Sequence, residues 1–250
     1  MIYPFMLCAL ASFSTGAGGV LVVMLKNMTG KTISVFQGFA AGVMVTISFT
    51  EMLPNCFENL MVKMGAAKAA FSTGIIFFIG WLTAILIGII VDFVYDNSSI
   101  TTPLEKVSLI TTAVMILHNL PEGMLTIFSG FGDRQFAAEM ALAVALHNIP
   151  EGVVVASGVL CITSSKKKAV CQSFFAGLCE FIGGVAAVLI FGDFISESLL
   201  SAVLAVVSGI MVQTSLCQIM PDSIRISHPK YTFGGFSLGI AVIYLGIFTI

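Results

Sequence analysis

Two near-copies of one hexapeptide carry the groups of this sequence that are best suited to hold a cation. They read His118-Asn119-Leu120-Pro121-Glu122-Gly123 and His147-Asn148-Ile149-Pro150-Glu151-Gly152. In each copy the histidine stands four residues before the glutamate, so the imidazole and the carboxylate share one face of a helix. The asparagine stands three residues before the glutamate and borders that face. This spacing favours a cation site.

The composition predicts that these groups lie inside a membrane. The chain is 58% apolar and only 10% charged, with a mean hydropathy of +1.05, whereas soluble domains carry about 25% charged residues. Ionisable groups at membrane depth are costly, so by default they mark a functional site. The sequence shows no basic surface that would suggest nucleic acid as a partner.

Eight apolar segments are long enough to cross a bilayer, which needs about 20 residues each. We expect an all-α polytopic membrane protein with a single transmembrane domain over residues 1–250. The expected spans are 4–25, 33–54, 71–94, 108–130, 138–161, 170–191, 197–220 and 233–249. One set of loops carries eight Lys and Arg residues and the other set carries three. The positive-inside rule then places the first set in the cytoplasm and both termini outside.

Three ligand-capable groups share one depth in this arrangement. His118 and His147 lie about 15 Å from either edge of a hydrocarbon core about 30 Å thick, and Glu180 lies at a similar depth in the sixth span. No Lys or Arg lies deep in any span. Carboxylates without basic partners there must be protonated, hydrated or neutralised by a bound cation. Pro121 and Pro150 each remove a helical hydrogen bond, so we expect a kink at both.

The ligand types indicate which cations fit. Imidazole with carboxylate suits Zn²⁺, Fe²⁺ or Mn²⁺ better than Ca²⁺ or Mg²⁺, which prefer oxygen alone. Neither motif contains a cysteine, which disfavours a soft Cu(I) site. We expect zinc as the transported ion, with iron, manganese, cobalt and cadmium as further candidates. The ion is cargo, and no cofactor is expected.

At these residues the chain resembles the ZIP family of divalent metal-ion transporters, and within it the ZupT-like subfamily. The likeness covers essentially the whole chain and rests first on the paired motifs in the fourth and fifth spans. It also includes Gln37-Gly38-Phe39-Ala40-Ala41-Gly42 in the second span and Gly177-Leu178-Cys179-Glu180 in the sixth. The resemblance implies import toward the cytoplasm by a rocking or elevator-like movement. It further implies that helices one to three and six to eight are inverted repeats.

The resemblance also implies a mid-membrane centre between the fourth and fifth helices that can hold two adjacent ions. In the implied ligand set, His118, Glu122, His147 and Glu151 form the first position, Asn119, Asn148 and Glu180 flank the second, Glu122 and Glu151 bridge the two, and Met44 offers a thioether. The chain departs from the subfamily pattern at Cys217 and Gln218, where an acidic pair is expected just before Met220-Pro221. The cytoplasmic end of the path therefore carries less negative charge.

Glu51 has two interpretations at this stage. It either recruits cations at the outer mouth or is a hydrated helix end.

Three functions fit these observations. The first is a secondary transporter that imports divalent cations; no P-loop GxxxxGK[ST] occurs, so the driving force is the ion gradient, the membrane potential or coupled protons rather than ATP. The alternative is an intramembrane metal-dependent hydrolase, but the HExxH spacing is absent and both motifs use HxxxE. A selective channel would use the same polar residues. We expect no enzyme, a plasma-membrane or bacterial inner-membrane location, and metal ions and membrane lipid as partners; a homodimer is compatible with the sequence.

Overall fold

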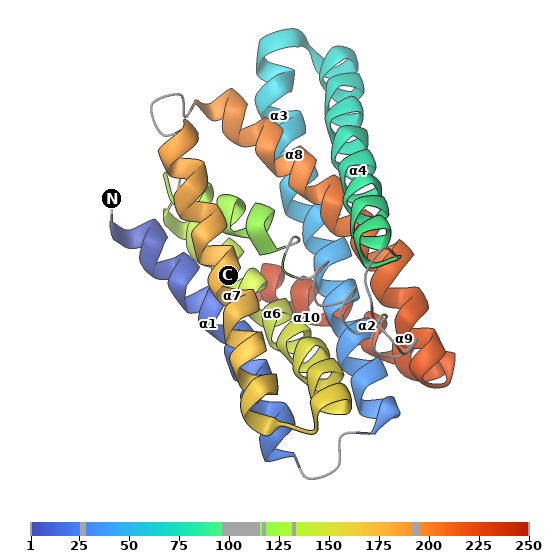
Figure 1. Ribbon diagram of the computed structural model, residues 1–250. Helices are drawn as coiled ribbons and strands as arrows, with labels where there is room; N and C mark the ends of the chain where they lie inside the picture. Colours follow the sequence, from blue (N-terminus) through green and yellow to red (C-terminus); the bar gives the residue numbers. More distant parts are fainter. Residues whose placement is uncertain are drawn as a thin grey trace.

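The computed structural model describes residues 2–25, 29–96, 116, 119–131, 134–191 and 196–249, and these residues contain helices and no strand. The helices are α1 (Ile2–Met24), α2 (Gly30–Ile47), α3 (Leu53–Met64), α4 (Ala66–Asp96), α6 (Arg134–Thr163), α7 (Lys166–Phe191), α8 (Glu197–Thr214), α9 (Met220–Ile226) and α10 (Pro229–Thr249). Two π-helical turns, η1 (Ser48–Met52) and η3 (Ser215–Ile219), join α2 to α3 and α8 to α9. Residues 119–129 form a further helical segment. Figure 1 shows the arrangement.

Six of the described helices are long and apolar enough to cross a membrane: Ile2–Met24, Gly30–Met64, Ala66–Ile90, Arg134–Leu160, Lys166–Ile190 and Ser198–Ile226. They coincide with six of the eight expected spans. The helical segment 119–129 falls within the fourth expected span, and α10 covers the eighth. The second expected span, 33–54, lies within a longer helical stretch, because α2, η1 and α3 run continuously from Gly30 to Met64.

Side chains are distributed as in a bundle that faces lipid. Large apolar residues of α4 point outward, including Phe71, Phe78 and Leu82, which are 62–72% exposed. Polar residues such as Asn119 and Glu180 are instead fully buried. In hydrocarbon the outer surface is apolar, and polar groups gain by facing one another inside the bundle.

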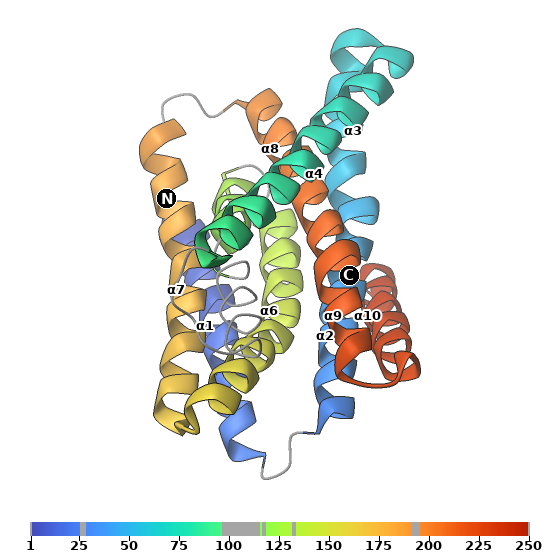
Figure 2. The ribbon, with the colours of Figure 1, turned by 45° about the vertical axis from the view of Figure 1, so that its right-hand side comes forward.

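The described helices form two groups. In the first, α1, α6 and α7 pack on one another; in the second, α2 packs on α10 and α4 packs on α8. Between the groups, α2 packs against α6. Figure 2 shows α7, α1 and α6 on one side and α2, α9 and α10 on the other. Both hexapeptides contribute to the first group.

A repeat that links α2 to α8 becomes visible in the structure. Gly42-Val43-Met44-Val45 is followed by Ser48 and Pro54, and Gly209-Ile210-Met211-Val212 is followed by Ser215 and Pro221 at the same spacing. Each serine begins a π-helical turn that ends just before the proline-bearing helix. The proline lacks the N–H that would close a regular turn there, so the backbone relaxes into a wider one. The two copies run in opposite directions (Figure 1).

Candidate metal centre

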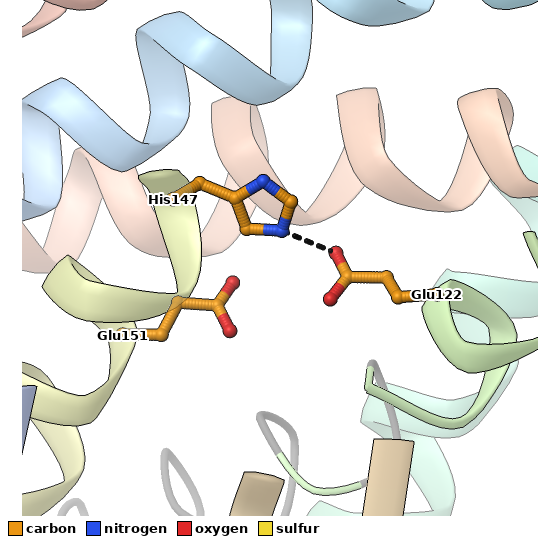
Figure 3. Close-up of side chains that lie close together, drawn as sticks. All are labelled: Glu122, His147 and Glu151. Carbon is orange, nitrogen blue, oxygen red and sulfur yellow. Dashed lines mark hydrogen bonds and ion pairs between the residues drawn. The ribbon is translucent and has the colours of Figure 1, made fainter. Parts of the chain in front are cut away.

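A carboxylate, an imidazole and a second carboxylate converge between the helical segment 119–129 and α6. Glu122, His147 and Glu151 each offer one ligand atom, and these atoms lie within 4.8 Å of one another. His147 Nε2 lies 3.0 Å from Glu122 Oε1, as Figure 3 shows. The three side chains are at most 1% exposed. The four-residue spacing places His147 and Glu151 on the same face of α6, as predicted.

One distance in this triad is close to the separation that a zinc ion requires. A tetrahedral zinc with bonds of about 2.0–2.1 Å holds its ligand atoms roughly 3.3 Å apart. The nitrogen-to-oxygen distance of 3.0 Å needs to open only slightly to admit the ion. The hydrogen bond between His147 and Glu122 uses a proton that a metal would replace. Two carboxylates in a buried site also carry a charge cost that a divalent cation offsets.

The two motif asparagines hold the central helices to their neighbours. Asn119 Nδ2 donates to the Ala176 carbonyl of α7 at 3.0 Å, and Asn148 Nδ2 donates to the Ala11 carbonyl of α1 at 3.0 Å. Both amide oxygens, Asn119 Oδ1 and Asn148 Oδ1, are buried and have no hydrogen-bond partner among the described residues. In each asparagine the amide nitrogen therefore joins two helices, and the amide oxygen remains available to bind a cation.

The glycine at the end of each motif allows these helices to approach closely. A Cβ atom on Gly123 would lie 1.7 Å from the Glu180 carbonyl oxygen, and one on Gly152 would lie 1.8 Å from the Thr15 carbonyl oxygen. Neither position accepts a side chain without displacing backbone. The close packing holds α7 beside the helical segment that carries Glu122, and α1 beside the helix that carries Glu151.

Glu180 joins the site from α7. Its Oε2 accepts a hydrogen bond of 2.7 Å from Asn148 Nδ2, and its Oε1 has no partner among the described residues. The side chain is fully buried and lies close enough to Glu122 and Glu151 for their charges to interact. The structure thus gathers Glu122, His147, Glu151, Asn148 and Glu180 in one region.

Four predicted residues remain: His118, Met44, Pro121 and Pro150. His118 lies outside the described residues. Met44 is fully buried in the apolar core, and its sulfur receives a hydrogen bond of 3.4 Å from Ser215 Oγ; ligation by its thioether stays a prediction. Helix α6 continues through Pro150 without a break, so the expected kinks at Pro121 and Pro150 also stay predictions.

Glu51 lies inside the π-helical turn η1, and its recruitment of cations at the outer mouth stays a prediction. It lines a cavity of about 130 Å³ with Glu139 and Leu146 of α6 and Val242 and Ile243 of α10. The cavity therefore reaches from Glu51 to the residue that precedes His147. Sequence reasoning did not identify Glu139, which stands near the start of the fifth expected span without a motif around it.

Cys217 and Gln218, which stand where an acidic pair was expected, lie in the other π-helical turn, η3. Gln218 Nε2 donates to Gln213 Oε1 at 3.3 Å, and Cys217 is exposed. In the repeat, Gln218 stands where Glu51 stands in the first copy. One π-helical turn thus carries a carboxylate and its counterpart carries an amide.

Comparison with known proteins identifies the family of this chain. A family profile described as ZIP Zinc transporter matches residues 97–250. A protein named "Zinc transporter ZupT" from Chlorobium phaeovibrioides is 32% identical, over 98% of this chain and 97% of its own. The chain belongs to the ZIP family.

Further ZIP relatives extend the likeness across distant bacteria. Proteins with the same name from Streptococcus mutans serotype c and Salmonella heidelberg are 32% and 31% identical, over 87% and 99% of this chain and 86% and 96% of their own. The resemblance inferred from the sequence is confirmed. ZIP proteins are transporters rather than enzymes, so this chain is a multi-pass integral membrane protein of the plasma membrane or bacterial inner membrane. The alternative of an intramembrane hydrolase is not supported.

Proposed function

We propose that this chain is a secondary transporter that imports divalent metal cations into the cytoplasm through a mid-membrane centre, with zinc as its main cargo. The observation that carries the proposal is the buried convergence of Glu122, His147 and Glu151 within 4.8 Å. Zinc is favoured because the relatives above carry the name zinc transporter and because imidazole and carboxylate are zinc ligands. Iron and manganese accept the same ligands and are secondary cargoes.

The centre has two adjacent positions in this proposal. His118, Glu122, His147 and Glu151 form the first, and Asn119, Asn148 and Glu180 flank the second, with Glu122 and Glu151 between them. The contact of 2.7 Å between Asn148 and Glu180 and the free amide oxygens of both asparagines support the second position.

The proposed topology has eight membrane spans with both termini outside and the centre between the fourth and fifth. In support, the facing ends of α1 and α2, of α6 and α7, and of α9 and α10 all lie toward the lower end of the bundle in Figure 1, whereas α3 turns into α4 at the upper end. The basic residues Lys31, Lys166 and Lys230 lie at the lower end by sequence position. The positive-inside rule makes that end cytoplasmic.

Transport needs the centre to face each side in turn. The ligands lie in the group formed by α1, segment 119–129, α6 and α7, and this group meets the second group where α6 packs on α2. A rocking or elevator-like movement of the first group relative to the second would carry the centre without dismantling it. The glutamates of the centre are also able to carry protons on the return step.

Zinc uptake into proteoliposomes tests this function. We expect His147→Ala and Glu151→Gln to lower radioactive zinc uptake at least tenfold, because removal even of groups that only support metal ligands costs roughly 10–100-fold. Glu58→Gln, which changes an exposed carboxylate on α3, is the matched control and should transport as wild type does. Equal uptake by wild type, His147→Ala and Glu151→Gln would remove the centre from the mechanism.

A further inference from the structure

Four buried oxygen atoms without a hydrogen-bond partner lie where α1, α6 and α7 meet. They are Ser12 Oγ, Thr15 Oγ1, Asn148 Oδ1 and Glu180 Oε1, and none has a partner at ordinary hydrogen-bonding distance among the described residues, although Ser12 lies close enough to the Glu180 carboxylate to interact with it. Their side chains are 0–6% exposed. Buried polar groups in proteins are nearly always paired, so a cluster of unpaired oxygens needs an explanation such as an absent ion. Two of the four atoms belong to α1, a helix that the proposed function above does not yet use.

The two hydroxyls are exceptional within this structure. Serines and threonines inside apolar helices usually donate to a carbonyl three or four residues earlier, and Thr46, Ser48 and Thr126 do so here, at 2.7–3.0 Å. Among the described residues, Ser12 and Thr15 are the buried hydroxyls whose oxygens have no partner at ordinary hydrogen-bonding distance. Neither hydroxyl therefore bonds to a carbonyl of its own helix, and both can turn to a ligand.

The packing brings these oxygens to one place. Asn148 Nδ2 bonds both to Glu180 Oε2 and to the carbonyl of Ala11, the residue before Ser12. Ser12 lies next to the Glu180 carboxylate. A Cβ atom added to Gly177 would lie 3.1 Å from the Thr15 Cβ. Gly177 stands one helical turn before Glu180. The cluster thus lies directly beside Glu151 and the metal centre.

The internal symmetry of the centre points to Thr15 independently. Asn119 donates to the Ala176 carbonyl and Asn148 to the Ala11 carbonyl. Four residues after each alanine, Glu180 and Thr15 present their carbonyl oxygens to the glycines that end the two motifs. Thr15 therefore occupies in α1 the place that Glu180 occupies in α7, with a neutral hydroxyl in place of a carboxylate.

We propose that Ser12 and Thr15 complete an oxygen-only cation position with Asn148 and Glu180, and that these hydroxyls raise the preference of the transporter for manganese relative to zinc. The inference rests on the proposed function, because it extends the second position of the same path. Hydroxyl, amide and carboxylate oxygens suit hard cations such as Mn²⁺, whereas zinc gains more from imidazole nitrogen. A cation there satisfies all four oxygens at once.

The test compares manganese and zinc uptake by the full chain in proteoliposomes. We expect the double variant Ser12→Ala/Thr15→Val to lose about tenfold in manganese uptake at low concentration, with zinc uptake within about twofold of wild type. Thr15→Ser, which keeps the oxygen, should retain the wild-type ratio. Ser208→Ala removes a buried hydroxyl that is bonded within α8 and is the matched control. An unchanged manganese-to-zinc ratio in the double variant overturns the proposal.

Direct binding supplies a second readout. The electron paramagnetic resonance signal of free Mn²⁺ falls as the ion binds, and the purified double variant should deplete it less than wild type and Thr15→Ser do. If the double variant does not fold, the manganese-to-zinc uptake ratio of Thr15→Val is compared with that of Thr15→Ser, and equal ratios overturn the proposal. Cys8, which lies near Ser12, should not alter the ratio when changed to alanine; a shift as large as that of the double variant would contradict an oxygen-only position. If Glu151→Gln loses zinc uptake while the hydroxyl variants keep the wild-type manganese-to-zinc ratio, the proposed transport function stands and the role of Ser12 and Thr15 is rejected.

Discussion

Replacing Gly152 by alanine should separate α1 from the metal centre. The added Cβ would lie 1.8 Å from the Thr15 carbonyl oxygen and 2.8 Å from its carbon. Ordinary contact begins at 3.4 Å, so α1 must retreat by about 1.6 Å at this point. The hydrogen bond of 3.0 Å between Asn148 Nδ2 and the Ala11 carbonyl would then exceed hydrogen-bonding distance. The substitution thus acts on the ligand shell without changing a ligand.

The expected magnitudes follow from this displacement. Overpacking of a tight interior costs about 1–3 kcal/mol, which lowers the melting midpoint of a chain of this size by roughly 2–4 °C per kcal/mol. Zinc uptake should fall by about tenfold or more, since misplacement of a site by about 1 Å has costs up to about a hundredfold. Uptake into proteoliposomes and thermal denaturation in detergent measure the two effects.

Gly74→Ala is the matched control for this prediction. A Cβ on Gly74 in α4 meets nothing within 4 Å, and alanine is the better helix former by about 1 kcal/mol. The control should therefore transport zinc as wild type does and melt at the same or a slightly higher temperature. If Gly152→Ala behaves like Gly74→Ala in both assays, the close contact between α1 and α6 does not position the centre.

Three further predictions use the same uptake assay. Glu51→Gln should raise the zinc concentration needed for half-maximal uptake by about two- to fivefold without changing the maximal rate, because Glu51 lines a cavity beside α6 and a rim charge mainly changes association. An unchanged half-maximal concentration would leave Glu51 a structural residue. Asn148→Leu should lower uptake about tenfold because it removes hydrogen bonds to Glu180 and Ala11, and wild-type uptake would show that neither bond matters. Uptake should fall as the pH drops from about 7 to 5, because protons compete with the metal for the imidazole and carboxylates of the centre; uptake that is constant over this range would argue against both His147 ligation and proton coupling.

The sequence predicted the parts of this protein that depend on local pattern. Apolar runs of bilayer length located the helices, and the spacing of His147 and Glu151 placed both ligands on one face of α6. Contacts that depend on how helices pack were not predictable. The bonds from Asn119 and Asn148 to carbonyls of α7 and α1 join residues 57 and 137 positions apart in the chain, and no pattern within one helix predicts them.

The location of Glu51 inside a π-helical turn is a second such case. Pro54, where the second expected span ends, does not break the backbone, because proline is tolerated in the first turn of a helix and α3 begins there. The repeat Gly42-Val43-Met44-Val45 and Gly209-Ile210-Met211-Val212 was the signal that could have linked η1 to η3. Such a short apolar repeat is inconspicuous in this sequence, because hydrophobic residues recur throughout the chain.

Anomalous diffraction from crystals of the protein soaked in zinc tests the central claim most directly. The account predicts a zinc peak between the helical segment 119–129 and α6, at about 2.0–2.2 Å from His147 Nε2 and from carboxylate oxygens of Glu122 and Glu151. The peak should vanish or weaken strongly in Glu151→Gln crystals treated in the same way. A zinc peak bound elsewhere, with no anomalous signal among these three side chains, would contradict it.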